Sequence, residues 1–202
     1  MNHDRGHRGF AAVWDWMSRH ESPRERELRA EVVGGARGQT LELGYGVGSN
    51  WPFLPPGVGY TGIEPDPAMR RRAEAHRPHG RELTLLDGDA QALGFPDDAF
   101  DTVIATLVFC TIPEPRKALA EAIRVLRPGG EFVFFEHVRA EGAAGSFAQT
   151  AMTPLWQLIG GGCHLNRKTL DAISATGFAS VSSRRMKIGA LPVIVGKAVK
   201  SL

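Results

Sequence analysis

Short apolar segments alternate with helical segments from about residue 40 onward, and this alternation constrains the fold most. The clearest strand is Glu131–Val138, which contains the apolar run Phe132–Phe135. An unbroken run of this kind suits a strand that is buried on both faces of a parallel sheet. The clearest helix is Pro115–Leu126, with apolar side chains at helical spacing and a Pro-Gly-Gly breaker after Arg127. The pattern predicts an α/β protein with a doubly wound sheet.

Seven strands are expected in this sheet. The last two, Phe178–Met186 and Pro192–Val199, have a connection too short for a parallel crossover, so we expect them to form an antiparallel hairpin. The sheet is therefore predicted to be Rossmann-like and mostly parallel, with an antiparallel C-terminal hairpin. The five preceding strands are predicted at Thr40–Leu43, Tyr60–Glu64, Leu83–Leu86, Thr102–Thr106 and Glu131–Val138.

Two parts of the chain differ in pattern. Residues 1–38 indicate an N-terminal helical arm, and residues 39–202 indicate one ligand-binding domain. The second helix of the arm is expected to start at Ser22-Pro23 and to run to about Val33. The first is expected to have an apolar face formed by Phe10, Val13, Trp14 and Met17.

Composition excludes few function classes. Hydrophobic residues make up 43% and charged residues 23% of the 202-residue chain, as in ordinary globular proteins. The net charge of +2 is too small to argue for nucleic acid by itself. From Cys163 onward seven Lys or Arg residues stand against one acid, Asp171. A solvated basic face is the preferred reading, and an anionic substrate or a lipid surface stays open.

The two cysteines, Cys110 and Cys163, are too few for a disulfide framework, so a reducing compartment is expected. The first ten residues lack the apolar region of a secretory signal. No segment approaches the roughly 20 apolar residues that cross a bilayer. The expected location is the cytoplasm, with peripheral membrane contact left open.

A glycine-rich turn follows the first strand directly. Gly44, Gly46 and Gly48 allow the backbone to approach a ligand closely. The dinucleotide fingerprint requires its third glycine at position 49, which is Ser49 here. Glu42, just before the turn, suits a cationic amino acid group better than a diphosphate. The pattern therefore departs from that of NAD-binding proteins.

Acidic residues stand at the ends of the next two strands. Glu64, which ends the second strand, can accept hydrogen bonds from two ribose hydroxyls, as in NAD enzymes. Asp89, after the third strand, can accept a hydrogen bond from an adenine amino group. The order of glycine turn, ribose acid and adenine acid on successive strands is much rarer by chance than each part.

These segments resemble the class I S-adenosylmethionine-dependent methyltransferases, in the branch called methyltransferase type 11. The resemblance covers roughly residues 38–140. It is carried by LELGYGVGSN at 41–50, GIEPDPAMR at 62–70, GDAQALGFPDDAFDTV at 88–103 and ALAEAIRVLRPGGEFVFFEHV at 118–138.

The resemblance implies S-adenosylmethionine as cofactor and assigns roles to single residues. The glycines should line its methionine and ribose part, and Glu42 should orient the amino end. Glu64 should bind the ribose, and Asp89 the adenine. The full implied site is Trp14, Glu42, Gly44, Gly46, Gly48, Glu64, Pro65, Asp89, Ala90 and Thr106. In this set, Thr106 should offer backbone contacts to the amino group, and Trp14 should cover the cofactor.

Two residues of the turn depart from the family pattern. Tyr45 stands where relatives usually have Cys or Ala, and Val47 stands where they usually have Thr. A bulky Tyr45 is expected to narrow the pocket, and the missing hydroxyl at Val47 to weaken cofactor binding. A degenerate, non-catalytic scaffold therefore remains an alternative.

A narrower resemblance points to the acceptor. TLVFCTIPEP at 106–115, FFEHV at 134–138 and PLWQLIGGGCHLNRKTL at 154–170 are similar to small thiol methyltransferases, and in part to bacterial phospholipid N-methyltransferases. The segment after the fourth strand lacks the Asn/Asp-Pro-Pro-Tyr sequence of base-modifying enzymes. We therefore expect a small or apolar acceptor, with a thiol preferred and no nucleic acid. Phospholipid or quinone-type acceptors at a membrane face stay open, and an NAD(P) reductase is disfavoured.

His164 and His137 are the candidate catalytic residues. His164 lies in a glycine-rich loop that is expected to close over the acceptor, where a neutral imidazole can take a proton from a thiol. His137 lies at the end of the fifth strand, where a site role and a structural role are about equally compatible with the sequence. Cys163 beside His164 is no zinc site without two further ligands, which the linear spacing does not supply, and Cys110 is expected to pack as a small hydrophobe. The sequence leaves the oligomeric state undetermined.

Overall fold

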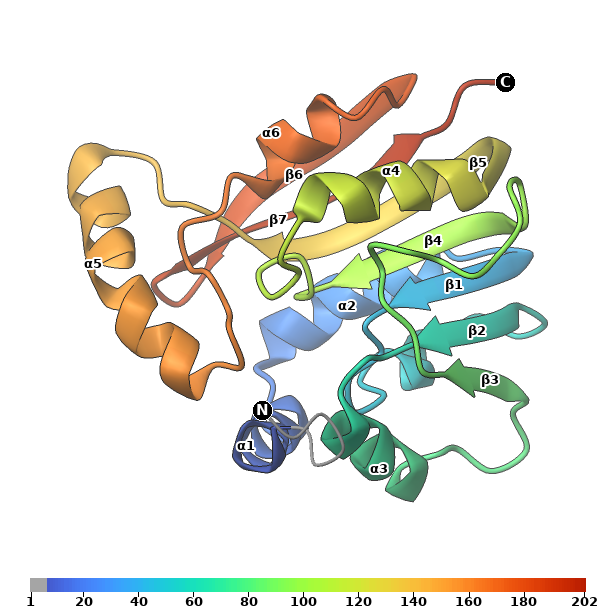
Figure 1. Cartoon of the computed structure of the whole chain (residues 1–202), viewed down its shortest axis with the longest axis horizontal. Helices are drawn as coiled ribbons and strands as arrows, with labels where there is room; N and C mark the ends of the chain where they lie inside the picture. The colour runs from blue at the N-terminus through green and yellow to red at the C-terminus, as the bar shows by residue number, and fades with distance from the viewer. Residues whose placement is uncertain (1–6) are drawn as a thin grey trace.

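The computed structural model describes residues 7–202 and confirms the expected α/β architecture (Figure 1). One seven-stranded sheet runs through the molecule in the order β3-β2-β1-β4-β5-β7-β6. The strands are β1 Gln39–Leu43, β2 Gly59–Ile63, β3 Leu83–Leu86, β4 Phe100–Thr106, β5 Leu126–His137, β6 Ser180–Ile188 and β7 Leu191–Val199. The first five strands pair in parallel, and β6 and β7 form the expected antiparallel hairpin. Strand β7 also pairs antiparallel with β5, a neighbour that the sequence did not predict.

Helices cover both faces of the sheet. One hydrophobic cluster joins α4 and α6 to one face, and a second cluster joins α2 and α3 to the other. The helices are α1 Arg8–Arg19, α2 Pro23–Gly34, α3 Pro67–Ala75, α4 Pro115–Val125, α5 Ala143–Ile159 and α6 Thr169–Ser174, with a short 3-10 helix at Trp51–Phe53. Among the described residues, no helix has the length and apolar character needed to cross a membrane.

Helix α2 begins where its sequence predicts. The hydroxyl of Ser22 accepts a hydrogen bond from the backbone N–H of Glu25, whose carboxylate accepts one from the backbone N–H of Ser22. This reciprocal capping satisfies N–H groups that a helix start leaves open. Pro23 occupies the first turn, where its missing N–H costs nothing. The cap thus defines the start of α2, the helix from which the buried side chain of Arg29 extends into the interior.

The apolar face predicted for α1 is wrong in two of its four positions. Val13 and Met17 are exposed, whereas Ala11 and Asp15 are buried. Asp15 accounts for this rotation because its carboxylate pairs with Arg72 of α3 at 2.8 Å and with Arg19 at 2.9 Å. Ion pairing with α3 thus turns the helix away from the orientation that hydrophobic periodicity predicts.

The boundary between α4 and β5 also differs from the prediction. We expected a turn at 127–130, but β5 begins at Leu126, directly after the helix. Leu126 is already extended, with φ −71° and ψ 139°, and it pairs with Phe100 of β4. Pro128 disfavours helical backbone at Arg127, and the pairing of Leu126 with Phe100 ends the helix one residue before that.

Candidate active site

A cavity of about 740 Å³ lies beyond the carboxyl ends of the parallel strands, where ligands bind in doubly wound sheets. Helix α1 and the loop after α5 also contribute to its walls. A Cβ atom at Gly161 would lie 2.6 Å from the Cδ1 atom of Phe10, so these two segments meet beside the cavity. All the predicted site residues line it except Gly48 and His164.

The glycine-rich turn needs glycine for backbone conformation and for space. Gly44, Gly46 and Gly48 have φ values of +66°, +55° and +87°, a region that other residues rarely adopt. A Cβ at Gly44 would lie 2.4 Å from the side chain of Val108, and one at Gly48 would lie 2.4 Å from the ring of Trp51. Gly48 therefore supports the turn from beneath and does not line the cavity, contrary to its expected role.

Glu64 stands directly after β2, with its carboxylate beside the turn. Its two oxygens accept hydrogen bonds from the backbone N–H groups of Gly46 at 3.0 Å and Asp66 at 2.8 Å. Burial raises the pKa of Glu64 to about 7, although these two hydrogen bonds oppose the rise. An almost fully buried carboxylate that lines a cavity is a strong acceptor for hydroxyl groups of a ligand.

Asp89 and Ala90 follow β3 and line the same cavity. Asp89 is exposed, and its carboxylate accepts a hydrogen bond from the backbone N–H of Gln91 at 2.9 Å. The Gln91 side-chain amide also donates to it. Ala90 is buried, with 7% of its surface exposed. Asp89 is thus oriented by its own turn and leaves acceptor capacity for an amino group.

Glu42 and Thr106 belong to a buried network that the sequence did not reveal. The amide of Asn50 donates to Glu42 at 2.6 Å and to the Thr106 hydroxyl at 2.9 Å. Arg29 donates to the Asn50 carbonyl oxygen at 2.6 Å and to Thr106 at 3.1 Å. The hydroxyl of Tyr60 donates to the second oxygen of Glu42. Arg29 is also paired with Glu21, so its charge is compensated.

Burial raises the pKa of Glu42 to about 7, against the hydrogen bonds from Tyr60 and Asn50 and the charge of Arg29. Glu42 both lines the cavity and, through its hydrogen bonds with Asn50 and Tyr60, links the residues behind the cavity wall. Among the described residues, the carboxyl groups that line the cavity are those of Glu42, Glu64, Asp66 and Asp89, and the guanidinium of Arg29 lines it with them. This excess of acidic groups suits a ligand with a sulfonium and an ammonium group, as S-adenosylmethionine has.

The unusual residues of the turn are buried in hydrophobic clusters. Tyr45 is 3% exposed and packs against Trp51, with 6.1 Å between ring centroids. Val47 packs with Ala11 and Met69. Tyr45 still lines part of the cavity, and its effect on cofactor affinity remains a prediction. Trp14, which was expected to cover the cofactor, lines the cavity beside Gly46.

The other part of the lining comes from the end of β5, from α5 and from the segments after β4 and α5. It contains Cys110, His137, Trp156 and Cys163 among apolar side chains. The Nε2 atom of His137 lies 3.1 Å from the Sγ atom of Cys163. Hydrogen bonds from Cys110 and His137 hold the pKa of the Cys163 thiol below its usual value, although burial opposes this.

Glu136 is fully buried beneath this region. Its Oε1 atom accepts hydrogen bonds from the backbone N–H groups of Val108 at 2.9 Å and Phe109 at 3.2 Å. Burial raises the pKa of Glu136 to about 7. The residue thereby fixes the segment after β4, in which Leu107 has a φ of +53°.

His164 does not line the cavity, although its neighbour Cys163 does. Its Nδ1 atom lies 3.2 Å from the carbonyl oxygen of Cys110 and 3.2 Å from the guanidinium of Arg167. Its backbone N–H donates to the same carbonyl at 2.9 Å. The position of His164 therefore suits attachment of the loop, and of the two candidate catalytic histidines it is His137 that lines the cavity.

Comparisons with known proteins agree with this geometry. Residues 41–134 match the family model described as a methyltransferase domain. The chain is 36% identical to thiol S-methyltransferase TMT1B of Homo sapiens over 95% of this chain and 84% of the relative. It is 40% identical to phosphatidylethanolamine N-methyltransferase of Cereibacter sphaeroides over 62% of this chain and 64% of the relative.

A similar fold occurs in Phospholethanolamine N-methyltransferase 2 of Haemonchus contortus, solved with phosphomonomethylethanolamine and S-adenosylhomocysteine. The TM-score is 0.73 at 16% identity, over 96% of this chain and 57% of that one. The combined evidence confirms the resemblance seen in the sequence and supports S-adenosylmethionine as the methyl donor. The chain is an S-adenosylmethionine-dependent methyltransferase, and it belongs to the family that includes the thiol S-methyltransferases.

Proposed function

We propose that the protein transfers the methyl group of S-adenosylmethionine to the sulfur atom of a small, apolar thiol. The observation that carries the proposal is the composition of the cavity wall formed by the end of β5, α5, the start of β7 and the segments after β4 and α5. Among the described residues of this wall, the polar side chains are two thiols, one imidazole and one hydroxyl, and none is a carboxylate or an amide. The polar residues are Cys110, Thr111, His137 and Cys163, and their apolar neighbours are Leu107, Val108, Ile112, Pro113, Trp156 and Leu191.

The reaction is an in-line displacement. The acceptor sulfur, as a thiolate, forms a bond to the methyl carbon while the bond from that carbon to the sulfonium breaks. The electron pair of the broken bond remains on the sulfur of S-adenosylhomocysteine. The protein contributes mainly by aligning the two sulfurs and by excluding water from an apolar site.

A methyl-transfer assay with labelled S-adenosylmethionine tests the acceptor. Small aliphatic and aromatic thiols should be methylated, whereas matched alcohols and phenols should not. The control is Glu64→Ala, which should lose activity at subsaturating cofactor. Methylation of phospholipids or quinols in the same panel, with thiols inert, would overturn the thiol assignment.

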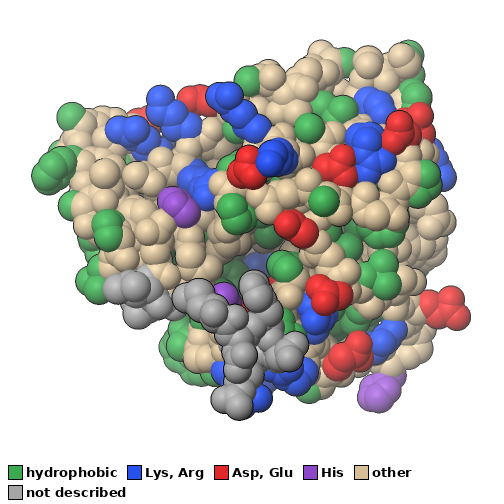
Figure 2. All heavy atoms as spheres, viewed as in Figure 1, with side chains coloured by type: hydrophobic (Ala, Val, Ile, Leu, Met, Phe, Trp, Pro, Cys, Tyr) green, Lys and Arg blue, Asp and Glu red, His purple; other side chains and the backbone are tan. Residues whose placement is uncertain are grey.

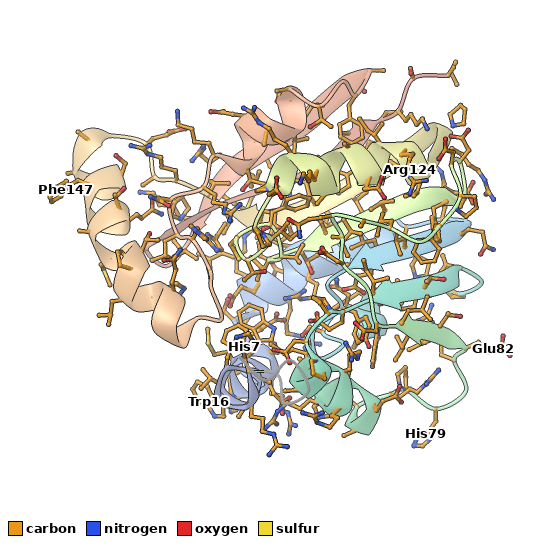
Figure 3. The ribbon with its side chains drawn as sticks, viewed as in Figure 1. His7, Trp16, His79, Glu82, Arg124 and Phe147 are labelled. Atoms are coloured by element: carbon orange, nitrogen blue, oxygen red, sulfur yellow. The ribbon has the colours of Figure 1, made fainter. Side chains whose placement is uncertain are left out.

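A second candidate is a lipid acceptor reached from a membrane surface, and exposed apolar side chains favour it. Trp16 of α1 is 62% exposed, and Phe147 of α5 is 75% exposed. Both point away from the body of the molecule (Figure 3). Hydrophobic side chains gather on the α5 side of the surface, at left in Figure 2. Further large apolar residues of these two helices that are exposed are Val13, Met17, Met152 and Leu155.

Vesicle flotation tests this membrane contact. If α1 and α5 dock on lipid, the double variant Trp16→Ser/Phe147→Ser should lose most of its binding to anionic vesicles. Leu86→Ser, an exposed apolar residue of β3, is the matched control and should bind as the unaltered protein does. Absence of the unaltered protein from the lipid fraction would reject the candidate.

We also propose a cytoplasmic location, which the two free thiols support.

A further inference from the structure

Three potential metal ligands meet at one point of the cavity wall. The Sγ atoms of Cys110 and Cys163 and one ring nitrogen of His137 all lie within 4.8 Å of one another. All three residues are buried, and all three line the cavity. The sequence suggested no metal site because Cys163 and His164 are adjacent and lack partners at usual spacing. The folded chain supplies those partners from the ends of β4 and β5.

The distances suit a tetrahedral ion. Zinc lies about 2.3 Å from thiolate sulfur and about 2.0–2.1 Å from imidazole nitrogen, so two ligand atoms of one tetrahedron are about 3.5–3.8 Å apart. The Nε2 atom of His137 lies 3.1 Å from the Sγ atom of Cys163, and no two ligand atoms of the cluster are more than 4.8 Å apart. These two distances lie on either side of the range that a tetrahedral zinc ion requires. Side-chain shifts of about an ångström or less therefore bring the three atoms to bonding distance.

Backbone hydrogen bonds hold the three ligand-bearing segments together. The N–H of His164 donates to the carbonyl of Cys110 at 2.9 Å, which ties the loop after α5 to the segment after β4. The N–H of Leu107 donates to the carbonyl of Phe135 at 2.8 Å, which ties that segment to β5. The cluster is thus placed by the fold and not by chance contact of long side chains.

His137 reaches the cluster through Nε2, which lies 3.1 Å from the Sγ atom of Cys163. Its Nδ1 atom is buried and has no hydrogen-bond partner in the part of the chain that the structure describes. When a metal ion takes the place of the proton between Nε2 and Cys163, the ring proton can reside on Nδ1 while Nε2 offers its lone pair. Neutral imidazole and two thiolates balance the charge of a divalent ion.

We propose that Cys110, Cys163 and His137 bind one zinc ion whose fourth position opens into the cavity. Three protein ligands and an open position are typical of catalytic zinc, whereas structural sites are closed by four. The identity of the fourth ligand rests on the proposed function: it is the sulfur of the acceptor thiol. That thiol loses its proton to solvent on ligation, and its sulfur then attacks the methyl carbon as described above.

Metal binding is measured without any turnover. The full chain, kept reduced with a phosphine and stripped of metal, is titrated with Zn²⁺ against a chromophoric chelator and separately with Co²⁺. One equivalent should bind, and cobalt should show the sulfur-to-metal charge-transfer absorption of thiolate ligation. A wild-type protein that fails to compete for zinc and shows no such absorption would overturn the site.

Variants identify the ligands. Cys110→Ser, Cys163→Ser and His137→Gln should each weaken zinc affinity by more than about 100-fold, because loss of an outer-shell partner alone costs about 10- to 100-fold. His164→Gln is the matched control, since His164 adjoins Cys163 but lies outside the cluster, and it should bind zinc as the wild type does. Binding of S-adenosylhomocysteine by each variant shows that it is folded. Equal zinc affinity in Cys163→Ser and wild type would contradict the assignment.

Activity then separates this inference from the proposed function. Metal removal should abolish thiol methylation, and one equivalent of zinc should restore it, while affinity for S-adenosylhomocysteine stays constant. A protein that methylates thiols equally well without metal overturns the zinc inference alone. A protein that binds zinc at these residues but transfers methyl groups only to non-thiol acceptors overturns the proposed function, and with it the thiolate as fourth ligand.

Discussion

Glu64 is the residue on which cofactor affinity should depend most. It is nearly buried, lies at the end of β2 and faces the glycine-rich turn. Glu64→Ala should weaken S-adenosylhomocysteine binding by about 1.5–3 kcal/mol, because charge-assisted hydrogen bonds to the ribose are lost. Asp89→Ala should cost less, since its exposed carboxylate meets one neutral amino donor. Calorimetric titration of both variants measures the difference, and unchanged affinity in both would place the cofactor elsewhere.

The raised pKa of Glu64 also predicts a pH dependence. The ribose binds the charged carboxylate, so affinity should fall as pH decreases through about 7, by at most about tenfold per pH unit. The free energy of unfolding of the unliganded protein should depend on pH in the opposite direction. A folded-state pKa above the unfolded value of 4.5 means that the folded protein binds more protons, so stability declines as pH rises from about 4.5 to 7.

Titrations at several pH values, in wild type and Glu64→Gln, measure both effects. The variant should lack most of the affinity change and part of the stability change, since Glu42 contributes a similar share of the latter. Identical pH profiles for wild type and variant would show that another group controls binding.

At the residue scale the sequence predicted the positions that follow strands. Glu64, Asp89 and Thr106 were found because strand ends of a doubly wound sheet meet at one edge. Arg29 and Asn50 were missed because their hydrogen bonds join positions far apart in the chain, although Asn50 ends the glycine-rich motif at 41–50. The three-ligand cluster was missed for the same reason: its members share a place only after folding.

At the scale of elements, the cap of α2 should matter for stability and for the site. Ser22→Ala removes the hydroxyl that accepts from Glu25 and should cost about 1 kcal/mol of unfolding free energy in urea. Cofactor affinity should fall slightly with it, because α2 carries Arg29 into the Asn50 network. Ser201→Ala, at an exposed position without a side-chain hydrogen bond, is the control. Equal midpoints for the two variants would show that the cap contributes nothing measurable.

Element types were predictable, and some orientations and boundaries were not. Periodicity located α1 but not its buried face, because one buried acid, Asp15, pairs with α3. The breaker after α4 correctly predicted a helix end, yet Leu126 already pairs with Phe100 in the sheet. In both cases a tertiary contact overrides a local preference.

At the scale of the whole molecule, the sequence pattern predicted the class of fold but did not predict the order of the strands in the sheet. Apolar runs and a short final connection predict a mostly parallel sheet with a terminal hairpin, as found. The insertion of β7 between β5 and β6 depends on pairing between Glu131 and Val199, residues at a large sequence separation. Local patterns contain no information on which strand edge accepts the hairpin.

The arrangement of the molecule predicts that α1 is a cover and not part of the core. Neither of the two large hydrophobic clusters contains a residue of α1, whereas Phe10 and Trp14 line the cavity. A chain that begins at Glu21 should therefore still fold, with a modest loss of stability because the ion pair between Asp15 and Arg72 is missing.

The affinity of the shortened chain for S-adenosylhomocysteine should fall more than tenfold, because the loss of an apolar wall exposes the bound cofactor to water. A binding free energy weaker by roughly 1.4 kcal/mol already corresponds to a factor of ten. Trp14→Ala in the full chain should show part of the same loss with little change in unfolding free energy. Calorimetry and urea unfolding on the shortened chain, Trp14→Ala and wild type separate the two contributions. If the shortened chain binds cofactor as tightly as wild type, α1 does not cover the site; if it fails to fold, α1 belongs to the core after all.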